Sequence, residues 1–297
     1  MNNQLTAVQQ IKFNNRNISY RRIGTGKRKI LFFHGFPGSS VQIEPFLEYI
    51  QDFDLEVLCF DRPGYHFSDA TQGTQFDQTT AVCKQIVESF GWLSCELIAV
   101  SGGTPFLFSF LENHPQFISR VHVVCGLGPI LTTGFEKIMS WKVKLALRIL
   151  PLIPGGIFAK IFPKNEAESN SPRFEILNYF LPPSPADAKT IQNPRNQNIL
   201  RQAVLEAVNQ NGKGPKLDAE SFLAQWKINV TEYQGPIDFW HGDDDHVVPL
   251  AMARQMHKQA ERSELTILNG QGHYSIAFNF LEPILAKGFS KNNGKTK

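Results

Sequence analysis

Three kinds of segment that mark other classes of protein are missing from this sequence. Its charges nearly balance, with 30 Lys and Arg against 27 Asp and Glu, and the basic residues form no concentrated stripe. This argues against a nucleic-acid surface, which depends on clustered positive charge. No uncharged run reaches the roughly 18 residues of a membrane-spanning helix, and Met1–Thr6 lacks the basic start and apolar core of a signal peptide. We therefore expect a cytoplasmic protein with no transmembrane segment and no nucleic-acid partner.

Cysteine is scarce as well. The four cysteines, Cys59, Cys83, Cys95 and Cys125, lie in apolar stretches. They lack the close Cys and His spacing that metal sites show. We expect buried, reduced thiols, and neither a metal nor another cofactor.

Short apolar runs alternate with segments of helical periodicity over much of the chain. Such alternation predicts a mostly parallel, twisted sheet flanked by helices on both faces, the α/β fold class. An opening hairpin is expected at residues 10–13 and 17–22. Further strands are expected at 29–33, 55–60, 97–100, 121–125, 236–240 and 264–268, and helices at 41–50, 79–90, 102–113, 250–259 and 274–287.

This alternation stops between about Pro129 and Asn229. We expect helices there instead, at residues 141–150, 173–181, 197–208 and 218–226, with no apolar run typical of a buried strand among them. We interpret residues 1–128 and 230–297 as the core domain and residues 129–229 as a helical cap inserted over the carboxyl ends of the strands. Segment 141–150 mixes apolar and cationic residues, so it fits a pocket wall, an ordinary packed helix or a membrane-surface contact.

A serine stands where one apolar run breaks. Leu97-Ile-Ala-Val100 ends in Ser101-Gly-Gly103, and a segment with Pro105 in a first helical turn follows. A serine on so tight a strand-to-helix turn needs small neighbours two positions away on each side, here Ala99 and Gly103. The turn lifts the hydroxyl above the sheet edge, although Ser-Gly-Gly after a strand is also a common structural turn.

Four further motifs follow other strands. They are His34-Gly-Phe-Pro37, Asp61-Arg-Pro-Gly-Tyr65 with Ser68, His241-Gly-Asp-Asp-Asp245 before Val-Val-Pro249, and Gly270-Gln-Gly-His273. With the serine turn, they give a serine, a cluster of acids and a histidine at three separate strand ends. In this order and spacing the chain resembles the α/β-hydrolase fold family, in its serine-nucleophile branch with a helical cap. Ala99 departs from the family pattern, which has glycine there.

The resemblance implies a catalytic triad and the absence of any cofactor. Ser101 would be the nucleophile and His273 the general base, because a serine hydroxyl needs an imidazole to take its proton. Family spacing favours Asp245 over Asp243 and Asp244 as the acid. By the same similarity, the backbone amides of Phe36 and Gly102 would form the oxyanion hole.

The remaining polar motif residues have simpler interpretations. His34 and His241 are expected to brace turns, and Asp61 and Arg62 to hold a turn together. His66 occupies a position where relatives have glycine, which makes it a candidate for the mouth of the site. The sequence gives no indication of the oligomeric state.

The leading functional hypothesis is a serine hydrolase that cleaves a small carboxylic ester, or an amide or thioester, through an acyl-enzyme. Carbon–carbon bond hydrolysis and cofactor-free peroxidation use the same triad and stay open. Epoxide hydrolases and dehalogenases attack with an aspartate at this turn, so Ser101 argues against them. A ligand-binding receptor with little turnover is the alternative outside enzymes, since a fold alone does not fix a function.

Overall fold

Eight strands form a single sheet in the computed structural model, which describes residues 5–13, 15–70, 72–132, 135, 137–139, 141–153 and 183–289. Their order is β1-β2-β4-β3-β5-β6-β7-β8. β1 and β2 pair antiparallel, β2 and β4 also pair antiparallel, and every other pairing is parallel. The strands are β1 (Gln9–Phe13), β2 (Arg16–Gly24), β3 (Arg28–Phe33), β4 (Leu55–Phe60), β5 (Cys95–Val100), β6 (Ile118–Val124), β7 (Ile237–Gly242) and β8 (Ser263–Leu268).

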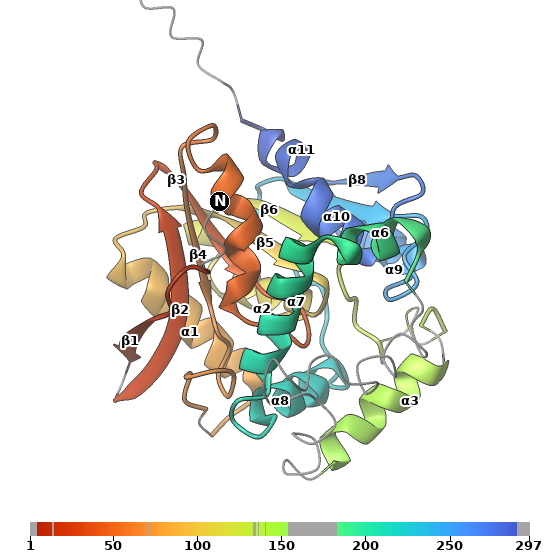
Figure 1. Cartoon of the computed structure of the whole chain (residues 1–297), viewed down its shortest axis with the longest axis horizontal. Coiled ribbons are helices and arrows are strands. Elements are labelled where there is room, and N and C mark those ends of the chain that lie inside the picture. Colours follow the sequence, from red (N-terminus) through yellow and green to blue (C-terminus); the bar gives the residue numbers. More distant parts are fainter. Residues whose placement is uncertain are drawn as a thin grey trace, which may run out of the picture.

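Helices cover both faces of this sheet (Figure 1). Leu31 and Phe33 of β3 pack into the core beneath α1 (Gln75–Ser89), α2 (Thr104–Asn113) and α9 (Leu250–Gln259). Ile30 and Phe32 of the same strand pack into a second core beneath the 3-10 helix η1 (Ser40–Tyr49), α10 (His273–Asn279) and α11 (Leu281–Ala286). Alternate side chains of one strand thus fill opposite cores, as the period of two in a strand requires. The predicted mostly parallel sheet with helices on both faces is confirmed.

Several helix boundaries differ from those expected, for local reasons. The helix expected at 41–50 is a 3-10 helix with Pro45 inside it. α1 begins four residues before the expected Thr79, because the side chain of Thr74 caps it by accepting the Asp77 amide. The helix expected at 274–287 is two helices, α10 and α11, which meet at Phe280.

Between β6 and β7 the described residues form helices and no strand. These are the α-helices α3 (Trp141–Ile149), α6 (Pro185–Gln192), α7 (Pro194–Ala207) and α8 (Lys213–Phe222), and the 3-10 helix η4 (Leu150–Leu152). In Figure 1 they run in green and teal from α6 beside α10 down to α8 and α3 at the lower edge. The helix expected at 173–181 lies outside the described residues, and α6 was not expected.

Segment 141–150 is helical, as its pattern predicted. Trp141, Leu145 and Ile149 of α3 are exposed, whereas Leu147 is buried. Among the described residues, no helix has the length and apolar character needed to cross a bilayer.

Candidate active site

Ser101 lies at the apex of the tight turn η2 (Ser101–Gly103), between β5 and α2. Its φ is +54°, in the left-handed region that a residue with a side chain rarely adopts. A Cβ at Gly103 would lie against the carbonyl oxygen of Phe33 and 2.8 Å from that of His34. Ala99 is fully buried between Phe33 and Val123 of the neighbouring strands. The backbone around Ser101 therefore leaves room only for small residues on either side.

His273 and Asp245 are brought together from two other loops. Asp245 follows β7, and His273 is the first residue of α10 after β8. The Nδ1 atom of His273 lies 2.8 Å from Oδ2 of Asp245. The other oxygen of Asp245 accepts hydrogen bonds from the amides of Val247 and Val248, both at 2.8 Å. These contacts fix the carboxylate while it holds the imidazole.

The two other aspartates of the cluster are engaged elsewhere. Asp243 accepts a hydrogen bond from the Gly270 amide at 2.7 Å. Asp244 lies 2.9 Å from Nε2 of His246, at the surface. Asp245 is the member of the cluster that contacts His273.

Burial and charge act in opposite directions on this pair. Burial disfavours a charged imidazole, but the charge of Asp245 and its hydrogen bond outweigh this and raise the pKa of His273 above its ordinary value. Burial likewise disfavours the carboxylate, but His273, by its charge and its hydrogen bond, lowers the pKa of Asp245. The arrangement therefore favours an ionised Asp245 and an imidazole that is more basic than usual.

The segment that follows β6 contacts both the Ser101 turn and the residue before His273. The carbonyl oxygen of Ser101 accepts a hydrogen bond from the Leu127 amide at 3.1 Å. In the same segment, Cys125 Sγ is 3.9 Å from the carbonyl oxygen of Gly272. No hydrogen bond joins Ser101 Oγ to His273 within the described residues. Such a contact commonly tightens only when substrate binds.

The loop after β3 approaches the serine turn. A Cβ at Gly102 would clash with the side chains of Phe36 and Phe222 and lie 3.5 Å from the Phe36 amide nitrogen. A Cβ at Gly35 would lie 3.7 Å from Cβ of Ser101. Among the described residues, the Phe36 amide donates to no backbone carbonyl. The amide-bearing residues Phe36 and Gly102 are thus neighbours beside Ser101.

Arg62 fixes the loop that follows β3. Its guanidinium donates to the carbonyl oxygens of His34 at 2.7 Å and Gly35 at 3.2 Å. The same group pairs with Asp218 of α8 at 2.5 Å, and both side chains are buried. Tyr65 donates its hydroxyl hydrogen to Asp218 at 2.6 Å. Arg62 therefore braces the loop after β3, with a counter-charge from the segment between β6 and β7.

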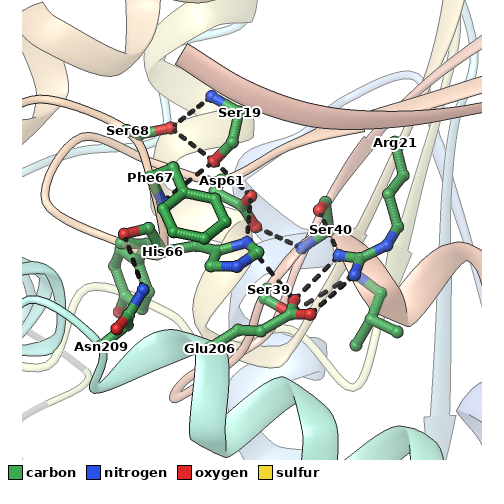
Figure 2. Close-up of polar contacts among 12 residues, drawn as sticks. Ser19, Arg21, Ser39, Ser40, Asp61, His66, Phe67, Ser68, Glu206 and Asn209 are labelled. Carbon is green, nitrogen blue, oxygen red and sulfur yellow. Dashed lines mark hydrogen bonds and ion pairs between the residues drawn. The ribbon is translucent and has the colours of Figure 1, made fainter. Parts of the chain in front are cut away.

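His66 belongs to a separate buried polar cluster, shown in Figure 2. Its φ is +44°, which is why glycine would suit this position. Its Nδ1 atom lies 3.3 Å from Asp61 and 3.7 Å from Glu206 of α7. Its imidazole faces these acids, and only 7% of the residue is exposed. The interpretation as a residue of the site mouth finds no support in this position.

The oxygens of the two acids in this cluster are already engaged. Glu206 forms two charged hydrogen bonds with Arg21, at 2.6 and 2.8 Å, and accepts another from the Ser39 hydroxyl. Asp61 accepts from the Ser19 hydroxyl and the Ser40 amide, both at 2.6 Å. Although Asp61, His66 and Glu206 lie close enough to share an ion, their contacts explain them as a structural network, and we assign no metal here.

Sequence reasoning missed three acids of the segment between β6 and β7 that hold the site loops: Asp187 of α6, Glu206 of α7 and Asp218 of α8. Each is at least 96% buried. Asp187 accepts the backbone amides of His273, Tyr274 and Ser275, each at 2.8 Å. A local signal for α6 did exist, because Ser184 caps it with Pro185 in its first turn. Nothing local indicated where the carboxylate would point.

Comparison with known proteins agrees with this architecture. Residues 29–151 match a family model described as alpha/beta hydrolase fold. An enol-lactonase from Burkholderia xenovorans is similar, with a TM-score of 0.69 and 14% identity over 94% of this chain and 98% of that one. A thermophilic esterase from Thermogutta terrifontis has a TM-score of 0.65 and 16% identity over 95% and 96% of the two chains. An epoxide hydrolase from Vigna radiata has a TM-score of 0.68 and 16% identity over 95% and 99%.

No curated protein matches the sequence. At such low identities the structural likenesses establish the fold and no particular reaction. The reaction has to be argued from the site.

Proposed function

We propose that this chain is a serine hydrolase that cleaves small carboxylic esters through an acyl-enzyme. The match of residues 29–151 to the alpha/beta hydrolase fold model and the likeness of the whole fold to solved hydrolases support a hydrolase activity. The observation that carries the proposal is the 2.8 Å contact between His273 Nδ1 and Asp245 Oδ2. The left-handed turn that holds Ser101 between β5 and α2 supports it. Enol-lactonase and esterase neighbours fit this reaction class.

The proposed reaction uses three side chains and two amides. His273 Nε2 takes the proton of Ser101 as its Oγ attacks the carbonyl carbon of the ester, and Asp245 stabilises the imidazolium that forms. The amides of Phe36 and Gly102 donate to the oxygen that becomes negative. The imidazolium then protonates the leaving alcohol, and water, activated by the same histidine, releases the acid and restores Ser101. This route requires no metal or cofactor.

The helical segment is proposed to be the cap of the substrate site, with residues 129–229 as the cap and residues 1–128 and 230–297 as the core. The support is the position of Phe222 of α8, whose ring packs edge-on against Phe36 with centroids 5.1 Å apart. The same ring approaches Gly102. A side chain of the insertion thereby borders the proposed oxyanion hole, where it would contact the substrate.

A fluorophosphonate probe tests this proposal directly, because it modifies a serine only when that serine is activated. We expect stoichiometric labelling of the purified protein at Ser101 and none of Ser101→Ala. Ser109→Ala, which changes a serine of α2 outside the site, is the matched control and should label as the wild type does. Failure of the wild type to react, or equal labelling of Ser101→Ala, contradicts the proposal.

A panel of esters, thioesters, amides and carbon–carbon bond substrates then separates the reactions that share this triad. We expect the highest kcat/KM with short carboxylic esters. Asp245→Asn should lower kcat by roughly 10⁴-fold, as loss of the orienting acid does in serine proteases. Tight binding of an ester without turnover would instead favour a receptor.

A further inference from the structure

Asp187 lies outside the proposed triad but contacts the backbone of His273, the proposed general base. Its side chain is fully buried. Oδ2 accepts the amide of His273, and Oδ1 accepts those of Tyr274 and Ser275, all at 2.8 Å. The fit is close, because a Cβ at Gly272 would come within 3.0 Å of both Asp187 Oδ2 and the Ser184 hydroxyl. The histidine loop is therefore built against this carboxylate.

These contacts supply a cap that α10 does not provide for itself. The first amides of a helix have no partner within the helix, and a side chain before the helix usually accepts them. The residue before α10 is Gly272, which has no side chain to offer. Asp187, 86 residues away in the sequence, fills this role with a negative charge, which the positive end of the helix also favours.

We propose that Asp187 is a positioning residue for His273, which fixes the backbone of the histidine and adds a second negative charge beside its imidazole. This inference rests on the proposed function, in which His273 is the general base. The backbone contacts hold the imidazole where Nδ1 reaches Asp245 and Nε2 is left for Ser101. The added charge favours the imidazolium that forms as Ser101 loses its proton.

The charged and titratable groups around His273 agree with this role. Asp245 after β7 and Asp187 of α6 both act to raise the pKa of His273. Burial lowers the pKa of His241 of β7, although the charge of Asp245 acts in the opposite direction. Burial raises the pKa of Tyr274 to about 12, and the charges of Asp187 and Asp245 act in the same direction. Burial also raises the pKa of the Cys125 thiol well above its usual range. The two carboxylates are thus the groups whose charges favour a protonated imidazole.

Asp187→Asn is the informative change, because the amide keeps the size and one acceptor oxygen but loses the charge. The asparagine oxygen can still accept from Tyr274 and Ser275, while its NH₂ group then faces the His273 amide, donor against donor. With less negative charge nearby, the pKa of His273 should fall. Since His273 acts as a base only when neutral, the acid limb of kcat/KM should move to lower pH.

The experiment compares wild type, Asp187→Asn, Asp187→Ala and Asn193→Ala. Asn193 caps α7 in the same inserted segment by accepting the Arg195 and Asn196 amides, and it is exposed. Asn193→Ala therefore removes a helix cap that does not contact His273, which makes it the matched control. We expect kcat to fall on the order of 10- to 100-fold in the Asp187 variants, as displacement of a catalytic group does. KM should change little, and among these four proteins the acid limb should shift in the two Asp187 variants and not in Asn193→Ala.

A titration of the His273 ring followed by NMR, assigned with His273→Gln, measures the same shift without any turnover. If the wild type is not labelled at Ser101, the proposed function fails, whatever this titration gives. If the wild type is labelled, but Asp187→Asn matches it in titration, kcat and pH profile, this inference alone is overturned. A loss of stability with an unchanged pH profile also overturns it.

Ser184→Ala provides a second test in case the Asp187 variants do not fold. The Ser184 hydroxyl accepts the Asp187 amide at 3.2 Å and so anchors the residue without replacing its charge. We expect a smaller fall in kcat in this variant, with the acid limb shifting in the same direction. Wild-type kinetics in Ser184→Ala, together with unfolded Asp187 variants, would count against a positioning role and for a purely structural one.

Discussion

Gly103, two positions after Ser101, shows how a single glycine can determine the path of a tight turn. The left-handed φ of Ser101 brings the turn so close to the end of β3 that Gly103 packs on the carbonyl oxygens of Phe33 and His34. At Gly35 the missing side chain matters for a different reason. Its φ does not lie in the left-handed region, and a Cβ there would meet only ordinary contacts, one of them Ser101 Cβ. Its missing side chain keeps space open beside Ser101.

We therefore expect Gly103→Ala and Gly35→Ala to differ sharply in stability. Gly103→Ala should lower the free energy of unfolding by at least about 1 to 3 kcal/mol, because the methyl group has no space. Gly35→Ala should change it by less than about 0.5 kcal/mol, while slowing the reaction of Ser101 with a fluorophosphonate. Urea unfolding measures the first effect, and equal stability of the two variants would contradict the explanation.

At the scale of elements, the helices between β6 and β7 are tied to the core by buried charge. Asp187 of α6 holds the histidine loop, Glu206 of α7 pairs with Arg21 of β2, and Asp218 of α8 pairs with Arg62. These contacts fix the helices at the loops that surround Ser101. The exposed pair Arg195 and Glu48 joins α7 to η1 as well, but with side chains 44% and 57% exposed.

Removing one partner of a buried pair should cost far more than removing one of an exposed pair. Asp218→Asn leaves the Arg62 guanidinium without its counter-charge and should lower the free energy of unfolding by about 3 to 5 kcal/mol. Glu48→Gln, the matched change in the exposed pair, should cost less than about 1 kcal/mol. Denaturant unfolding of both variants tests this, and similar losses would mean that α8 is not held by this pair.

The sequence predicted the strands and the flanking helices well, because both depend on local patterns. Apolar runs such as 55–60 mark buried strands, and capping residues mark helix starts. α6 was missed because Pro183 and Pro185 suggest a turn, although Ser184 and Asp187 form a recognisable start. The partners of Asp187, Glu206 and Asp218 could not be predicted, since they lie 86, 185 and 156 residues away in the sequence.

For the site, the sequence motifs gave the candidate residues, and the resemblance to a family gave their roles. Whether Asp243, Asp244 or Asp245 meets His273 depends on the path of a loop, which spacing alone does not determine. In the structure the neighbouring carboxylates bond to Gly270 and His246 instead. The assignment of the triad and of the oxyanion amides remains a prediction for the experiments above.

At the scale of the whole molecule, all four cysteines are buried and free. Burial raises the pKa of the Cys95 thiol to about 12 and those of Cys59, Cys83 and Cys125 well above their usual range. A thiol reacts as the thiolate and must be reached by the reagent. These thiols should therefore be inert in the folded protein.

An aromatic disulfide reagent tests this prediction. We expect negligible reaction with the native protein near neutral pH and the release of four equivalents after unfolding in guanidinium chloride. The melting temperature should be the same with and without a reductant, because the chain contains no disulfide to reduce. Rapid reaction of one thiol in the native state would show that the fold opens locally at that cysteine.

The three buried carboxylates, Asp187, Glu206 and Asp218, also limit how this protein could be redesigned. A graft that replaced residues 129–229 by the helices of another enzyme would leave the first amides of α10 uncapped and two arginines without their counter-charges. Each deficit falls next to a loop of the proposed site. A new substrate preference is therefore better sought by point changes on helices that stay in place than by transplanting the whole segment.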